Sequence, residues 1–432
     1  MLETAQELLE QAWRALMGLI AQPFYYVAGL LIVLHYIRQT RMERKLFHVR
    51  LHIWPRLLVR AIVAGALAGA AVSAAGVFIG LTLTPDATLW LWGMTLVLLL
   101  LRVRYLCFAY SAGLLGLLQW GAGFTPLGSH EGVIGTFVRS LAELDIPGLL
   151  LLVALLHAAE ALLVRAEGAR LATPLFLEGK RGKLVGGYAL QGYWPVPLLL
   201  LMPAAAGGSA AGIGLPWTPL LGGTDGSGGW TLIALPAIIG FTELTRSVVP
   251  GSQARLTARN LLVYSMILAA LAAGSVFWPP LVPAAAICSL VLHEVLIRMG
   301  VRRERERSPL YVHDERGLRV LGVVPGTPAE QLGIMAGEVL HKVNGRRVRT
   351  KEDLHAALHI NSAFCKLELF NLEGQLKFTQ RARYEGEHHQ LGVILAPDED
   401  AGYYAAPAPA SLLDLVRRSR AAHRRDVRET SF

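Results

Sequence analysis

Ionisable side chains inside apolar runs are the residues of this sequence that could carry chemistry, because a charge buried in lipid is costly unless it finds a partner. His157 and Glu160 lie one helical turn apart in one such run, and His293 and Glu294 lie near the end of another. An imidazole beside a carboxylate could pass a proton or an ion, whereas two histidines on one helix could hold zinc. The spacing of these residues along the sequence distinguishes a transport role from metal-dependent catalysis.

The zinc protease pattern is incomplete in this sequence. Such a helix carries two histidines four residues apart, but the residue four positions after His293 is Ile297, and no apolar run holds an aspartate as a third ligand. A serine protease is no better supported, because Gly207-Gly208-Ser209 has no histidine near it in sequence. The cysteines are far apart and form neither a disulfide framework nor a metal site: they are Cys107, Cys288 and Cys365.

We therefore expect no enzyme activity, no catalytic residue, no metal and no cofactor. His157 and Glu160 are interpreted as a hydrogen-bonded pair inside a helical bundle. The alternative function is a membrane transporter or sensor in which this pair forms a proton or ion path, although no discontinuous helical repeat supports it.

The composition places most of the chain in a membrane. Hydrophobic residues make up 53% of the 432 residues and charged residues only 17%. The formal net charge of +9 would suggest nucleic acid in a soluble protein. Here the positive residues stand at the ends of apolar runs, as membrane orientation requires, so no nucleic-acid partner is expected.

Nine apolar runs are candidate membrane spans, and we predict all of them to be helical. A run of about 20 residues crosses the hydrocarbon core, and several of these runs are shorter than that. They cover residues 15–37, 62–83, 89–101, 105–120, 146–164, 193–206, 231–244, 261–278 and 281–299. The pair 89–101 and 105–120 could instead form a re-entrant hairpin without changing the orientation of the other spans.

The charges of the connections predict the orientation. Lysine and arginine gather in the connections 38–60, 102–104, 165–191 and 245–260, whereas the opposite connections contain only Arg139. Because positive loops stay in the cytoplasm, the C-terminus is expected on the cytoplasmic side of a cytoplasmic membrane. Gly65, Gly69, Gly76 and Gly80 stand at small-residue spacing in the second run. They allow close helix packing, either inside the bundle or in an oligomer.

Residues 317–397 predict a compact α+β domain after the membrane part. An alternating strand at 318–324 precedes a Pro-Gly turn, and Asn344-Gly345 between two short strands is a strong hairpin signal. Thr350 and Asp353 resemble a capping box that opens a helix at 351–359. Further strands are expected at 366–370, 375–381 and 391–395.

This order of elements resembles a circularly permuted bacterial PDZ domain, with Gly322 to Ala329 and Lys342-Val343-Asn344-Gly345 as its fingerprints. The resemblance implies that extended or C-terminal peptides add as a strand beside a helix. The residues expected to bind the peptide are Leu391, Gly392, Val393, Ile394 and Leu395 on the strand side, with Leu354 and Leu358 on the helix side. The alternative for the two leucines is core packing.

The expected architecture is a polytopic α-helical membrane bundle followed by a small α+β PDZ-like domain. Its parts are an amphipathic segment at 1–22, the bundle at 23–300, a charged connector at 301–309, the domain at 310–397, and an Ala/Pro linker with a basic tail at 398–432. The tail is expected to attract anionic lipids at about 1 kcal/mol per arginine. Its last residues, Glu429 to Phe432, have a form that PDZ grooves accept.

The whole chain resembles the MinJ family of cell-division topological determinants. The resemblance rests on the many spans, the basic first loop from Arg41 to Arg50 and the single C-terminal PDZ-like domain. It implies a membrane scaffold at septa and poles that links a DivIVA-type protein to MinD, and so to the MinC and MinD inhibitor. The arginine-rich tail departs from the family pattern.

Overall fold

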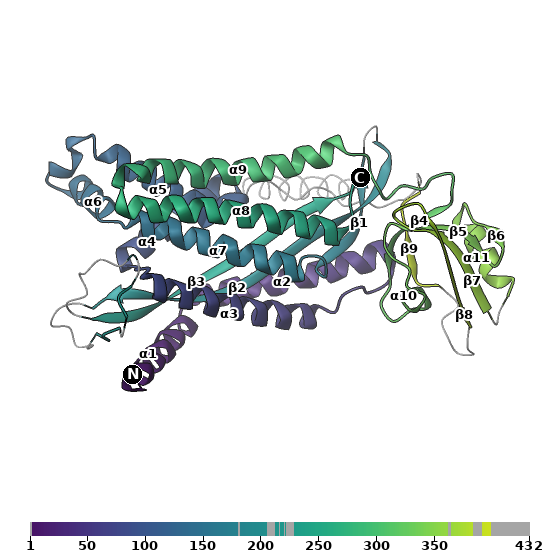
Figure 1. Cartoon of the computed structure of the whole chain (residues 1–432), viewed down its shortest axis with the longest axis horizontal. Helices are drawn as coiled ribbons and strands as arrows, with labels where there is room; N and C mark the ends of the chain where they lie inside the picture. Colours follow the sequence, from purple (N-terminus) through teal and green to yellow (C-terminus); the bar gives the residue numbers. More distant parts are fainter. Residues whose placement is uncertain are drawn as a thin grey trace, which may run out of the picture.

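The computed structural model describes residues 2–179, 182–204, 212–215, 217–219, 221, 229–361, 364–382 and 391–398. The membrane part is built from helices α1 (Leu2–Ile20), α2 (Pro23–Phe47), α3 (Trp54–Ile79), α4 (Pro85–Leu101), α5 (Phe108–Ala122), α6 (Val133–Ala142), α7 (Ile146–Glu167), α8 (Pro250–Phe277) and α9 (Val282–Glu306). Short 3-10 turns lie at η1 (Val103–Leu106), η2 (Pro126–Ser129) and η4 (Pro279–Leu281). The predicted C-terminal domain lies at one end of this long body (Figure 1).

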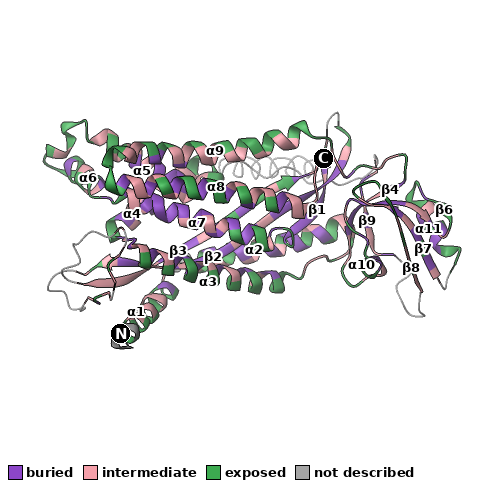
Figure 2. Ribbon diagram, viewed as in Figure 1, coloured by how far each residue is buried: buried purple, intermediate pink, exposed green. Residues whose placement is uncertain are grey.

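Four helices of the described chain are long and apolar enough to cross a membrane: α3, α7, α8, and α9 with its preceding turn. A fifth span results if α1 and α2, which are bent by 66° at their junction, count as one. Helix α7 is the buried centre of the bundle, while α3 and α9 expose apolar side chains on their outer faces (Figure 2). The polytopic bundle is thus confirmed, but with fewer spanning helices than the nine runs suggested.

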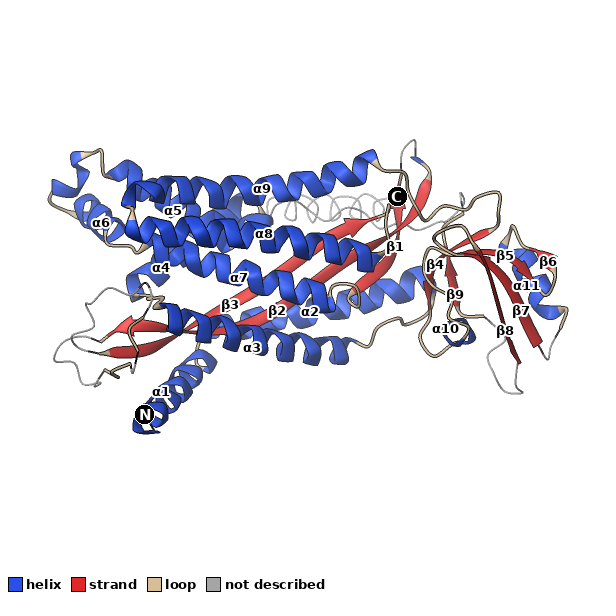
Figure 3. Cartoon of the chain, in the orientation of Figure 1, coloured by secondary structure: helices blue, strands red, loops and turns tan. Residues whose placement is uncertain are grey.

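The helices predicted at 193–206 and 231–244 are wrong. These residues lie in strands β2 (Leu184–Pro203) and β3 (Trp230–Thr245), which form an antiparallel hairpin, with β1 (Ala172–Glu178) on the other side of β2. The sheet runs diagonally between the helices (Figure 3). Proline explains the difference, because Pro195, Pro197 and Pro236 would each remove a hydrogen bond from a helix interior and clash with the preceding turn.

Beyond its pairing with β1, which ends at Leu190, the edge of β2 opposite β3 is covered by α3 and the residues after it. The N–H of Leu199 donates to Ser73 Oγ at 2.8 Å, and the carbonyl of Leu201 accepts from the N–H of Leu83 at 2.8 Å. Because strand residues alternate between the two edges, Pro195 and Pro197 face the same way as Leu199, and proline has no N–H to satisfy. A strand edge can therefore exist at membrane depth here.

The small-residue stripe of α3 provides the close approach that this contact needs. A Cβ added to Gly65 would lie 2.1 Å from Pro195 O, and one added to Gly69 would lie 2.4 Å from Pro197 O. The stripe therefore packs against β2 inside the chain, which was the bundle-packing alternative. Gly80 ends α3 in the left-handed conformation, at φ 93°.

Helices α4 and α5 are shorter than a full span and are joined through η1. Thr84 caps α4 by accepting from the N–H of Ala87, with Pro85 at the first helical position. Helix α5 packs closely on α9: a Cβ on Gly113 would meet Leu290 at 2.8 Å, and one on Gly116 would meet Ala286 at 2.9 Å. Small residues thus bring the middle of α5 against the first half of α9.

The C-terminal domain contains the elements that the sequence predicted. Its strands are β4 (Leu318–Val323), β5 (Val339–Val343), β6 (Arg346–Arg347), β7 (Phe364–Phe370), β8 (Leu376–Ala382) and β9 (Val393–Leu395), and its helices are α10 (Pro328–Gln331) and α11 (Lys351–His359). The sheet order is β8-β7-β5-β4-β9, and β6 pairs with β5. The strand from the end of the domain therefore lies next to its first strand.

This domain docks directly on the end of the membrane sheet. The N–H of Gly186 in β2 donates to Tyr311 O at 2.9 Å, and the hydroxyl of Tyr188 donates to Leu321 O. Behind the sheet, the carboxylate of Glu304 at the end of α9 accepts from the N–H of Arg246 and from the hydroxyl of Ser247. The bonds of Gly186 and Tyr188 thus tie the domain to the membrane sheet in addition to its covalent connection, and Glu304 ties the end of α9 to the residues after β3.

Candidate peptide-binding site

Strand β9 has one paired and one unpaired edge. The N–H of Val324 donates to Gly392 O, and the N–H of Ala396 donates to Arg319 O, so the even-numbered residues face β4. By alternation, the backbone groups of Val393 and Leu395 point to the opposite edge. In the part of the domain that the structure describes, no strand pairs with that edge. It offers a peptide the hydrogen bonds of strand addition.

The loop before β9 is held in place by hydrogen bonds that its backbone carbonyl groups accept. Leu391 O accepts from the N–H of Ala329 at 2.9 Å, at the start of α10. Gly392 has φ 84°, and a Cβ there would lie 2.2 Å from Thr327 Oγ1. Only glycine fits this turn. The resemblance to a PDZ domain assigned this loop to carboxylate binding, and that role stays a prediction.

Helix α11 is positioned by two polar links. The N–H of Asp353 donates to Thr350 Oγ1 at 3.1 Å, and the Asp353 carboxylate accepts from the N–H of Thr350, so the predicted capping box is confirmed. At its other end, Asn344 Nδ2 donates to Ala357 O, while Asn344 Oδ1 accepts from the N–H of Lys366. The hairpin turn thereby ties α11 to the sheet.

The side chains predicted to bind peptide do not all face one groove. Leu354 and Leu358 are 5% and 6% exposed and share the domain core with Leu391. Val393 and Leu395 are half-buried against that core, whereas Ile394 packs in the cluster that joins the domain to the membrane part. The two leucines of α11 therefore pack in the core, and the peptide-binding role of the seven residues stays a prediction.

Asp398 connects the chain after β9 to α11. Its carboxylate oxygens lie 2.6 Å from Lys351 Nζ and 3.2 Å from His313 Nε2. The pair with Lys351 is half-exposed and therefore weak. It places the chain after β9 beside Lys351, in the first turn of α11.

A cluster that the sequence did not predict lies inside the membrane part. His157 Nε2 is 4.0 Å from Glu160 Oε2, but it is only 3.4 Å from Cys107 Sγ, and His293 Nε2 is 3.7 Å from the same sulfur. At 4.0 Å the two side chains are not hydrogen-bonded, so the predicted hydrogen-bonded pair of His157 and Glu160 is wrong. Cys107 is 50 residues from His157 and 186 residues from His293 in sequence, and no spacing signal spans such separations.

The basic first loop is organised around a buried acid. Residues 38–47 continue α2 as a helix, and the Glu43 side chain at its inner face is fully buried. Glu43 accepts from the N–H groups of Leu51 and His52 and lies 2.6 Å from His52 Nδ1. The other ring nitrogen of His52 is 3.1 Å from Arg170 O. Each ring nitrogen of His52 thus faces a hydrogen-bond acceptor. Only the charged imidazolium can donate from both nitrogens, so this arrangement favours the charged form.

Because of the contact between His52 and Glu43 in this loop, we expect the folding stability of the protein to depend on pH. Burial of His52 favours the neutral ring, but the hydrogen bond and charge of Glu43 outweigh it and raise the pKa of His52 above its usual value. A raised folded-state pKa stabilises the protein below the unfolded pKa of about 6.5, and this stabilisation is lost as the pH rises through the folded pKa. Thermal unfolding of the full chain should therefore occur at lower temperature at pH 9 than at pH 6.

The matched variant is His52→Gln, which keeps one donor for Glu43 but cannot titrate. It should lose the His52 part of the difference between pH 6 and pH 9, leaving a smaller change than the wild-type chain shows. An equal pH dependence in both chains would contradict the assignment of this effect to His52.

Comparison with known proteins agrees with this architecture. Residues 319–367 match the PDZ domain family. The chain is 29% identical over 381 residues to the cell division topological determinant MinJ of Bacillus subtilis (strain 168), covering 87% of this chain and 92% of that protein. It is 28% identical over 379 residues to the probable cell division topological determinant MinJ of Lacticaseibacillus paracasei, covering 84% and 93%. The chain is therefore a homologue of the MinJ cell division topological determinants, a polytopic membrane protein that carries a C-terminal PDZ domain.

Proposed function

We propose that this protein is a membrane scaffold in bacterial division-site selection, with no enzymatic role. The observation that carries the proposal is the likeness to MinJ proteins along 87% of the chain, including a PDZ domain. The unpaired edge of β9 supports it, because that edge is suited to bind a protein segment by strand addition.

The proposed partners are a DivIVA-type protein at the poles and septum and a MinD-type protein that carries the MinC inhibitor. The membrane confines the scaffold to two dimensions, which raises the effective concentration of each partner beside the other. Weak contacts to the PDZ domain and to the cytoplasmic loops would then suffice to hold both. The scaffold would thereby concentrate the inhibitor where division must not begin.

The proposed orientation places the PDZ domain in the cytoplasm. Arginines from two separate elements meet at the end of α9 that leads to this domain, around an open hollow of about 660 Å³. They are Arg102, Arg104, Arg298, Arg302 and Arg305, with Glu294 as the acidic residue among them. Because positively charged residues gather on the cytoplasmic side of membrane proteins, this end of the bundle is expected to face the cytoplasm.

The decisive experiment reconstitutes the full chain in lipid nanodiscs and measures its binding to the purified DivIVA-type and MinD-type proteins of the same organism. We expect each protein to bind alone and both to bind together. Empty nanodiscs are the control for direct lipid binding of the MinD-type protein. Failure of both proteins to bind above that control would overturn the proposed function.

The transporter or sensor alternative predicts a different outcome. It requires His157 and Glu160 for function but not for partner binding. His157→Ala in cells should then leave the partner proteins at their normal positions and still abolish the function. A scaffold instead loses partner localisation when its binding edge is disrupted.

A further inference from the structure

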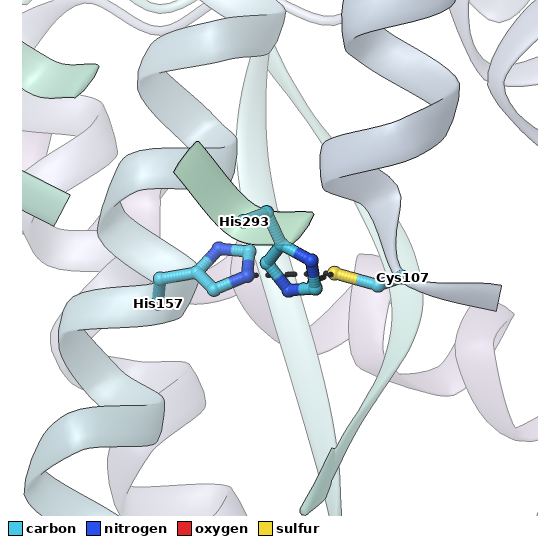
Figure 4. Close-up of side chains that lie close together, drawn as sticks. All are labelled: Cys107, His157 and His293. Carbon is cyan, nitrogen blue, oxygen red and sulfur yellow. Dashed lines mark hydrogen bonds between the residues drawn. The ribbon is translucent and has the colours of Figure 1, made fainter. Parts of the chain in front are cut away.

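Three helices bring a cysteine and two histidines together in the interior of the membrane part. Cys107 immediately precedes α5, His157 lies in the middle of α7, and His293 lies in α9. Their side chains converge, and the Cys107 sulfur contacts Nε2 of both imidazole rings (Figure 4). One ligand atom from each residue lies within 4.8 Å of the other two.

The separations fit a tetrahedral metal site. With a zinc–sulfur distance of about 2.3 Å and a zinc–nitrogen distance of about 2.0–2.1 Å, a tetrahedron separates sulfur from nitrogen by about 3.6 Å. The two observed separations are 3.4 Å and 3.7 Å. A modest inward shift of the two imidazoles would complete the arrangement around one ion.

The orientation of His157 is that of a metal ligand. Its Nδ1 lies 2.8 Å from Val153 O, and a carbonyl can only accept, so Nδ1 carries the proton and Nε2 presents its lone pair to the cluster. Backbone carbonyls commonly fix the tautomer of ligating histidines in this way. His157 is 3% exposed, so this polar nitrogen is aimed into the interior and away from any solvent.

Aromatic rings enclose the cluster. Tyr264 packs edge-on against His157 at 5.0 Å between ring centroids, and Tyr110 packs edge-on against His293 at 5.0 Å. The hydroxyls of these tyrosines are engaged elsewhere, with Ser289 O and Glu294. Nδ1 of His293 has no hydrogen-bond partner among the described residues. The walls thus hold the rings in place without competing for their ligand nitrogens.

We propose that Cys107, His157 and His293 bind a single transition-metal ion of the Zn²⁺ type. One thiolate and two imidazoles suit borderline-soft ions, whereas Mg²⁺ and Ca²⁺ require oxygen ligands. The fourth position is left to water, held beside the Glu160 carboxylate that lies 4.0 Å from His157 Nε2. The ion would fasten α5, α7 and α9 to one another, a structural role independent of peptide binding.

The test uses the full chain purified in detergent, stripped with a chelator and titrated with Co²⁺ and with Zn²⁺. Cobalt bound to a thiolate gives a sulfur-to-metal charge-transfer band, so the wild-type chain should show this band at one equivalent of Co²⁺. Cys107→Ser should lose the band. His157→Gln and His293→Gln should each weaken Zn²⁺ binding by at least the roughly tenfold to hundredfold that loss of an outer-shell partner costs, because each removes a direct ligand.

Cys288→Ser is the matched control, because Cys288 lies on α9 outside the cluster. It should keep the charge-transfer band and the wild-type affinity. Thermal unfolding of each metal-free variant shows whether it is folded, and Zn²⁺ should raise the unfolding temperature of the wild-type chain but not that of Cys107→Ser. The proposal is overturned if the band persists without Cys107, or if Zn²⁺ stabilises both chains equally.

Discussion

Gly65→Ala should destabilise the membrane part by about 3 kcal/mol or more, although it adds only one methyl group. The new Cβ would lie 2.1 Å from Pro195 O, far inside van der Waals contact, and its three nearest neighbours are all backbone atoms of Pro195 in β2. That strand cannot move away alone, because it is paired with β3 along its length. Helix α3 would have to separate from the sheet, which also breaks the bond between Ser73 and Leu199.

The measurement is thermal unfolding of the full chain in detergent, together with the yield of monodisperse protein. Gly93→Ala is the matched control, because Gly93 is an exposed glycine of α4 with no atom within 4 Å of an added Cβ. Helix propensity alone favours alanine there by about 1 kcal/mol, so this variant should be neutral or slightly stabilised. Equal unfolding temperatures for the two variants would show that α3 and β2 are not in close contact.

The C-terminal domain could be predicted from the sequence because its signals are local. Asn344 and Gly345 adopt φ angles of 50° and 79°, as their turn requires, and Thr350 closes its capping box within four residues. The groove side chains were harder to assign, because helical spacing places Leu354 and Leu358 on one face without telling whether that face meets the core or a peptide.

The membrane hairpin could not be predicted from hydropathy, which measures the preference for lipid and not the type of secondary structure. Both a helix and a covered strand satisfy the backbone at that depth. The prolines at 195, 197 and 236 were the available signal against helices. The cluster of Cys107 with two histidines had no comparable signal, because it depends on how α5, α7 and α9 pack.

Val393→Pro should weaken binding of the proposed division partners by about tenfold or more while leaving the domain folded. The N–H of Val393 points to the unpaired edge of β9, so proline removes a donor that pairs with no strand among the described residues of the domain. Leaving the peptide acceptor without a partner costs about 1–3 kcal/mol, and 1.4 kcal/mol corresponds to a factor of ten in affinity. The ring also obstructs the approach of a paired strand.

Two further variants separate this effect from damage to the fold. Val393→Thr keeps the backbone donor and the branched shape, so it should bind both partners like the wild-type chain. Ile394→Pro removes an N–H that faces β4, and it should unfold the domain. Binding is measured on full-length chains in nanodiscs, with the DivIVA-type and MinD-type proteins tested separately. If Val393→Pro retains both affinities, the two proteins bind elsewhere, and the open edge of β9 is not the surface through which the proposed scaffold would recruit them.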